Sequence, residues 1–128
     1  LPIDVFVWDM QWHTPSHWCG FEWHPELYPD PKGLLDWMHE KGLVVPLNLH
    51  LAGVPLDEKH LPAIAKEIGE DLQERIDDFE AAPLSTASWQ VSHSVDDVFA
   101  YDFNKPDHAQ AVFEHLIAPL YDDGVDFF

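Results

Sequence analysis

Three short apolar runs, each next to polar residues, organise the chain, and the first of them lies within the stretch Ile3 to His13. Its centre, Val5 to Trp8, is rich in β-branched and aromatic residues, which is typical of a parallel strand buried on both faces. The chain then turns polar at Asp9 and Gln11. Because α/β folds bind ligands at the carboxyl ends of their strands, these polar positions are the first candidates for ligand-binding or catalytic residues.

The next pattern predicts a helix followed by a second buried strand. Asp30 suits an N-cap and Pro31 the first helical position, and an apolar stripe then runs to Gly42. Residues 43–49 form the second apolar run, which ends in the polar residues Asn48 and His50. A strand, a capped helix and a second strand predict a right-handed βαβ unit.

A second amphipathic helix is predicted from Asn104 and Pro106 to Gly124, with apolar residues at spacings of three and one. Pro119 is expected to kink its last turn, and residues 125–128 begin a third strand.

Two segments do not fit this regular order. Residues 14–29 are predicted to be an irregular, aromatic-rich loop whose tryptophans pack under it or face a ligand. A helical pattern interrupted at Gly69 and a polar stretch at 83–95 are interpreted as parts of an insertion at about 55–98.

Composition narrows the class of protein. A chain of 128 residues corresponds to one domain or part of one, and 46% hydrophobic residues favour a packed core. The net charge of −18 would repel nucleic acid and anionic membranes, so neither is an expected partner. Solubility or a salt-adapted surface is the simplest explanation of this acidity. The single cysteine, Cys19, excludes an internal disulfide framework and is compatible with the reducing cytoplasm.

The chain contains neither an apolar run long enough to span a bilayer nor a basic-then-apolar leader. It begins and ends within strand-like patterns, so both ends are predicted to be cut.

Four passages, taken together, resemble glycoside hydrolase family 31, the α-glucosidase and α-xylosidase family, whose catalytic domain is a (β/α)8 barrel. They are Asp4-Val-Phe-Val-Trp-Asp-Met-Gln-Trp-His13, Trp18-Cys-Gly-Phe-Glu-Trp23 with the 28–33 and 37–42 segments, Asn48-Leu-His50, and Tyr101-Asp-Phe103 leading to Gly124-Val-Asp-Phe127. The resemblance implies an α/β chain that forms a partial TIM barrel, from about strand 2 to the start of strand 4.

The resemblance also implies a function. Family members are retaining glycosidases, which need two carboxyl groups about 5 to 5.5 Å apart, one as nucleophile and one as acid/base. The nucleophile is expected a few residues beyond Phe128, and the acid/base residue later still. The chain would therefore line the sugar subsite of an α-glucosidase-like enzyme and be inactive alone, with no cofactor and no metal needed.

The sequence departs from the family pattern at three places. Gln11 stands where the second carboxylate of an Asp-x-Asp motif is usual, and the charge-assisted contact of that carboxylate with a sugar hydroxyl is then lost. Leu51-Ala52-Gly53 replaces a common Pro-Ala-Asp, and Cys19 replaces a common threonine.

Seven residues are predicted to contact the sugar through hydrogen bonds or aromatic stacking. They are Asp9, Gln11, Trp12, Trp18, Trp23, Asn48 and His50. Each also has a structural explanation, as a loop hydrogen-bonding residue or a packed aromatic ring. Trp8 and Trp37 are expected in the core, and Asp126 is expected to make a helix-to-strand contact rather than to act as nucleophile.

Two other functions compete with this interpretation. His13, His17, Cys19 and His24 are four potential zinc ligands, although their spacing matches no common structural zinc pattern. The chain could instead be a self-sufficient α/β carbohydrate-binding module. Three parallel strands outside a closed barrel leave two unpaired edges, so the glycosidase interpretation requires the remainder of the barrel or a second copy as partner.

Overall fold

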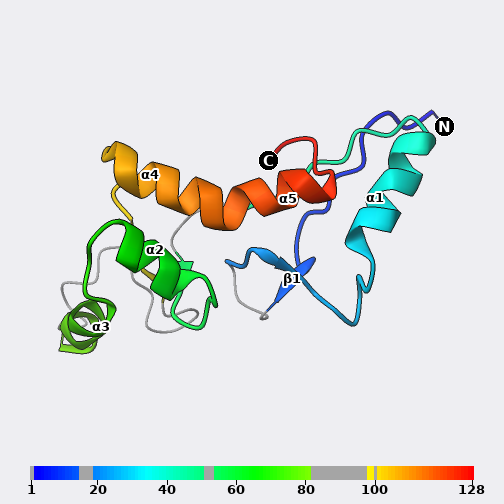
Figure 1. Ribbon diagram of the computed structural model, residues 1–128. Helices are drawn as coiled ribbons and strands as arrows, with labels where there is room; N and C mark the ends of the chain where they lie inside the picture. Colours follow the sequence, from blue (N-terminus) through cyan, green and yellow to red (C-terminus); the bar gives the residue numbers. More distant parts are fainter. Residues whose placement is uncertain (1, 15–18, 51–53, 82–97, 100) are drawn as a thin grey trace.

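The computed structural model describes residues 2–14, 19–50, 54–81, 98–99 and 101–128. Trp18, His17 and the polar stretch at 83–95 lie outside this part of the chain. The described elements are strands of two residues each and helices, and a long helical stretch lies near the C-terminus (Figure 1).

Three extended segments run side by side, with residues 44–48 in the middle. Parallel bridges join Val5 to Val44 and Trp8 to Leu47, as the sequence predicted. On the other edge, the N–H of Asp126 donates to the carbonyl of Val45, and the N–H of Leu47 to the carbonyl of Phe127, each at 3.1 Å. The contacts advance in the same direction along both segments, as in a parallel pair.

The prediction that the first segment is buried on both faces is wrong. Val5, Phe6 and Val7 are 46%, 43% and 54% exposed. The helices pack on the middle segment instead, where Val45 and Leu47 are almost completely buried. The apolar run is an outer strand-like segment in this chain, and sequence composition could not distinguish an outer segment from an inner one.

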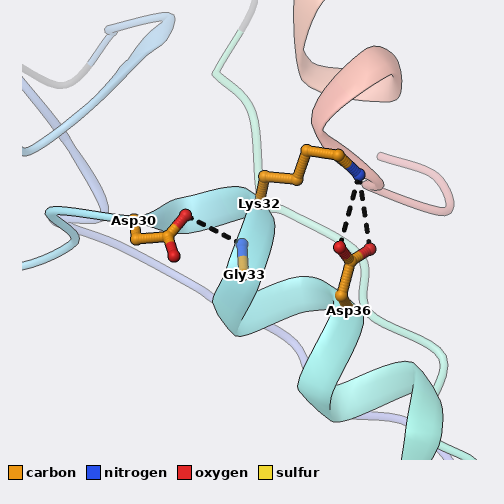
Figure 2. A network of polar contacts seen from close by, with 4 residues as sticks. All are labelled: Asp30, Lys32, Gly33 and Asp36. Atoms are coloured by element: carbon orange, nitrogen blue, oxygen red, sulfur yellow. Dashed lines mark hydrogen bonds and ion pairs between the residues drawn. The ribbon is translucent and has the colours of Figure 1, made fainter.

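Helix α1, Pro31–Glu40, begins as predicted. The Asp30 carboxylate accepts a hydrogen bond from the N–H of Gly33 at 3.0 Å, which satisfies one of the free donors of the first turn (Figure 2). Leu35 and Met38 are buried, whereas Trp37 is 53% exposed, so its expected place in the core is wrong. At 100° per residue, Trp37 lies on the face opposite Leu35.

The predicted long helix contains three parts: α4, Pro106–Val112; the π-helical segment η2, Phe113–Ile117; and α5, Ala118–Asp123. Pro119 stands in the first turn of α5 and has no N–H to donate to the preceding turn. That turn is widened, and the N–H of Ala118 donates to the carbonyl of Phe113. Gly124, at φ +114°, ends the helix in the left-handed conformation that glycine favours.

This long helix joins two hydrophobic clusters, one near α2 and one near α1 (Figure 1). The first contains Phe21, Val54, Leu61, Ile64, Tyr101, Ala111, Val112, Leu116 and Ile117. The second contains Trp12, Leu35, Met38, Val45, Leu47, Leu120 and Val125. The π segment and the start of α5 therefore span the boundary between the clusters.

The segment interpreted as an insertion begins and ends at a small antiparallel sheet. Strand β3, Val54–Pro55, pairs with β4, Val98–Phe99. Between them lie α2, Leu61–Glu67, and α3, Leu72–Ala81, with Gly69 at φ +73° separating the helices. The interruption predicted at Gly69 is confirmed, and the status of 55–98 as an insertion stays a prediction.

The loop predicted to be irregular contains a second antiparallel pair. Strand β1, His13–Thr14, pairs with β2, Glu22–Trp23, so that His13 lies opposite Trp23. Two residues per strand are too few for an alternating pattern, and the sequence could not reveal them. Across the described residues, every helix is too short or too polar to cross a membrane.

Candidate functional site

The polar residues that follow the two bridged segments meet at one rim. Asp9 follows Trp8, and Asn48 follows Leu47, directly after the parallel bridge. The side-chain amide of Asn48 donates a hydrogen bond to the Asp9 carboxylate. The backbone N–H of Asn48 also donates to the carbonyl of Trp8 at 2.8 Å, which fixes the register of this contact. The sequence-based expectation that these positions lie together therefore holds for this pair.

Trp12 holds the backbone of Asn48 at the same rim. Its side chain has no exposed surface, and its indole Nε1 donates to the carbonyl oxygen of Asn48 at 3.0 Å. Asn48 is thus held through its carbonyl, its N–H and its amide. Of the seven predicted sugar contacts, Trp12 is the one whose burial argues against direct contact with a ligand.

Gln11 turns the chain at this rim. It has φ +60°, and among the described residues it is the one non-glycine residue in the left-handed region. Side chains other than glycine, asparagine and aspartate rarely adopt this conformation, and such residues occur more often at functional sites. The Gln11 side chain is exposed.

The remaining predicted residues are partly buried or undescribed. Trp23 is half-buried, packs edge-on against Trp12 with ring centroids 5.2 Å apart, and donates from Nε1 to the Asp123 carboxylate at 3.0 Å. It lines a pocket of about 400 Å³ between β2 and the long helix. His50 is half-buried two residues after Asn48, and Trp18 lies outside the described residues.

Asp126 makes a helix-to-strand contact, as the sequence suggested. Its carboxylate accepts a hydrogen bond from the N–H of Val45 at 2.6 Å and lies 3.0 Å from Nε2 of His39, on α1. Burial alone would raise the pKa of Asp126, but the Val45 and His39 contacts outweigh it and hold the pKa below its usual range.

Sequence reasoning missed a second polar group, formed by Glu22, Glu58 and His60. Glu58 is 5% exposed and accepts a hydrogen bond from the N–H of His60 at 3.3 Å. Burial raises the pKa of the Glu58 carboxyl, and the nearby Glu22 charge adds to that effect. Residues 57–60 appear in the sequence as an ordinary charged turn, and nothing in it pairs them with Glu22.

The predicted zinc ligands are not the group that the structure brings together. In the described part of the chain, the one set of three candidate ligands with mutually close donor atoms is Glu22, Glu58 and His60. His13, Cys19 and His24 do not form such a set, and His17 lies outside the described residues.

Comparison with known proteins identifies the family. All of residues 1–128 match the glycosyl hydrolases family 31 TIM-barrel domain, and the chain belongs to this family. The predicted family is therefore confirmed. The match also shows that the chain is part of the TIM-barrel domain of a glycoside hydrolase. The described residues show parallel bridges between the first two segments and hydrogen bonds from the second segment to residues 126–127, and the partial barrel stays a prediction.

Two curated relatives carry the same enzyme name. Alpha-xylosidase XylQ of Lactiplantibacillus pentosus is 44% identical over 45 residues, which is 35% of this chain and 6% of that protein. An alpha-xylosidase of Emericella nidulans is 40% identical over 43 residues, which is 34% of this chain and 6% of that protein. The aligned segments thus span a small fraction of either relative. Neither name supports the α-glucosidase specificity that the sequence suggested.

Proposed function

We propose that this chain supplies one wall of the sugar subsite in a retaining α-glycosidase. The observation that carries the proposal is the Asn48–Asp9 hydrogen bond, which holds a carboxylate at the carboxyl ends of two parallel segments. Ligands of TIM-barrel enzymes bind at that end of the strands. Asp9 would accept hydrogen bonds from sugar hydroxyls, and Gln11 would offer a neutral amide beside it.

The chemistry itself requires residues other than these. A retaining mechanism needs a nucleophile and an acid/base carboxyl group flanking the glycosidic bond. The family resemblance supports their location after Phe128, so this polypeptide should bind part of the substrate and not cleave it. The exposed Val5, Phe6 and Val7 side chains support the same dependence, because further barrel elements or a second copy would cover them.

The α-xylosidase names of both relatives make an α-xyloside the substrate to test first, ahead of an α-glucoside. The two sugars differ by a hydroxymethyl group, and a pocket usually discriminates such a difference by only a few kcal/mol. No cofactor is invoked for the glycosidase reaction. A cytoplasmic location is part of this proposal, and its support is the single buried Cys19.

The test uses the full-length protein that contains this chain. We expect it to hydrolyse 4-nitrophenyl α-xyloside faster than the α-glucoside, and proton NMR should show that the first sugar released is the α-anomer. The 128-residue chain should show no turnover under the same conditions. Release of the β-anomer would contradict a retaining mechanism, whereas binding of xylose without turnover by the full-length protein would favour a carbohydrate-binding module.

A further inference from the structure

Glu22, Glu58 and His60 converge from two separate parts of the chain. Glu22 belongs to β2, and the other two belong to the turn that leads into α2. Their candidate donor atoms all lie within 4.8 Å of one another. We propose that this group binds a divalent first-row transition metal ion, for which Zn²⁺ is the probe. The proposal does not depend on the glycosidase function.

The spacing of the donor atoms suits a tetrahedral ion. Zinc binds histidine nitrogen and carboxylate oxygen at about 2.0 to 2.2 Å, so two ligands of one tetrahedral ion are about 3.4 Å apart. Nε2 of His60 lies 3.4 Å from Oε1 of Glu22. A small adjustment of the Glu58 carboxylate would bring the third donor to the same ion.

Burial and backbone contacts prearrange the third ligand. Glu58 is 5% exposed, and the N–H of His60 holds its Oε1 at 3.3 Å. A carboxylate removed from water is costly unless a cation or hydrogen bonds compensate it. A metal ion would neutralise Glu58 and Glu22 together.

Lys59 provides a competing cation. Its ammonium group pairs with the Glu22 carboxylate, and its side chain is 63% exposed. Because an exposed lysine can return to solvent at little cost, a metal ion can displace it from Glu22. The single positive charge of Lys59 beside Glu22 would then be replaced by the double positive charge of the metal ion.

The donor set favours zinc over magnesium or calcium. Imidazole is a ligand of first-row transition metals, whereas Mg²⁺ and Ca²⁺ select oxygen ligands. Glu22, Lys59 and His60 also line the pocket of about 400 Å³, which leaves space for a water molecule as a fourth ligand. The bound ion would connect β2 to the turn before α2 and so stabilise this part of the fold.

The experiment is isothermal titration calorimetry of the full-length protein that contains this chain, treated with chelator and then titrated with ZnCl2. We expect one ion per chain, a rise in melting temperature with zinc, and no binding of Mg²⁺ at the same concentration. Glu22→Gln and His60→Gln should each weaken zinc affinity at least tenfold, since even outer contacts of metal sites have effects of 10- to 100-fold. Lys59→Met should bind zinc more tightly than the parent chain.

His115→Gln is the matched control. The His115 ring lies 6.4 Å from that of His60 and lines the same pocket, but its Nε2 contacts Glu67 instead of the proposed ligands. Its zinc affinity should equal that of the parent chain. The proposal fails if the parent chain binds no zinc, if Glu22→Gln and His60→Gln retain its affinity while circular dichroism shows them folded, or if Lys59→Met binds no more tightly.

Discussion

The amide of Asn48 donates a hydrogen bond to the carboxylate of Asp9, and this contact joins the carboxyl ends of two parallel segments. The contact orients the Asp9 carboxylate, a charged hydrogen-bond acceptor, at the rim, where its side chain stays exposed. The indole N–H of Trp12 in turn holds Asn48 by donating a hydrogen bond to its carbonyl oxygen. The pair is therefore a prearranged polar group at the position where barrel enzymes bind substrate.

The first prediction concerns catalysis by the full-length protein. Asn48→Ala should lower kcat/KM for an α-xyloside about tenfold, because Asp9 loses the hydrogen bond that orients it, and bonds to charged groups contribute about 1.5 to 3 kcal/mol. Steady-state kinetics would measure this. Asn104→Ala is the control, since Asn104 also donates to a carboxylate, Asp102, but on an exposed turn before α4. Equal activity of both variants would argue against a role for the Asn48–Asp9 pair.

The second prediction concerns the first turn of α1. Asp30→Ala should reduce the free energy of unfolding by about 1 kcal/mol, because the N–H of Gly33 loses its capping partner. Asp36→Ala removes a carboxylate from the same helix, yet it should change stability by less than about 0.5 kcal/mol. Its partner is the exposed Lys32, at 3.3 Å, and such surface pairs contribute little (Figure 2). Urea denaturation of the two variants distinguishes a cap from a surface ion pair.

The third prediction concerns acid. Since the folded-state pKa of Asp126 lies below its ordinary value of 3.8, its contacts contribute stability above that pH and lose the contribution as pH falls through the lower folded pKa. Asp126→Asn should melt at a lower temperature than the parent chain at pH 6. The difference should shrink as the pH is lowered below 3.8. A difference that is constant from pH 6 to strongly acidic solution would contradict the assignment.

The fourth prediction concerns alkali. Tyr101 is 7% exposed, and burial raises the pKa of its phenol from 10.0 to about 12. The neutral phenol is therefore favoured in the folded chain, and stability should be fully present below pH 10 and fall as the pH rises towards 12. Tyr101→Phe should abolish this alkaline loss, as followed by thermal melting at a series of pH values.

The same substitution should not destabilise the chain at neutral pH. Among the described residues, the Tyr101 hydroxyl is buried without a hydrogen-bond partner, and Arg75 packs over the ring at 4.8 Å from its centroid. Phenylalanine keeps the ring face for Arg75 and removes a polar atom that burial penalises. Stability equal to that of the parent chain, or higher by about 1 kcal/mol, is the expected result. A loss above 1 kcal/mol would mean that the hydroxyl has a partner.

Local contacts explain which parts of the fold were predictable. Asp30 caps α1 through a residue three positions away, and Gly124 ends α5 because that position requires a positive φ. Both features depend on neighbours within one helical turn, so the local sequence is sufficient to predict the helix cap and the helix end. The parallel pairing of the first two segments was also predictable, because a helix between two apolar runs leaves few other connections.

The sequence by itself determined the start of α1, the end of α5, the family and the polar residues that follow the strand-like segments. Tertiary structure decided which tryptophans are covered: Trp12, expected to contact the sugar, is fully buried, whereas Trp37, expected in the core, is 53% exposed. It also brought Glu22 to Glu58 and His60. Burial and convergence of distant charges depend on how separate elements pack against one another, and a linear pattern records only the neighbours of each residue along the chain.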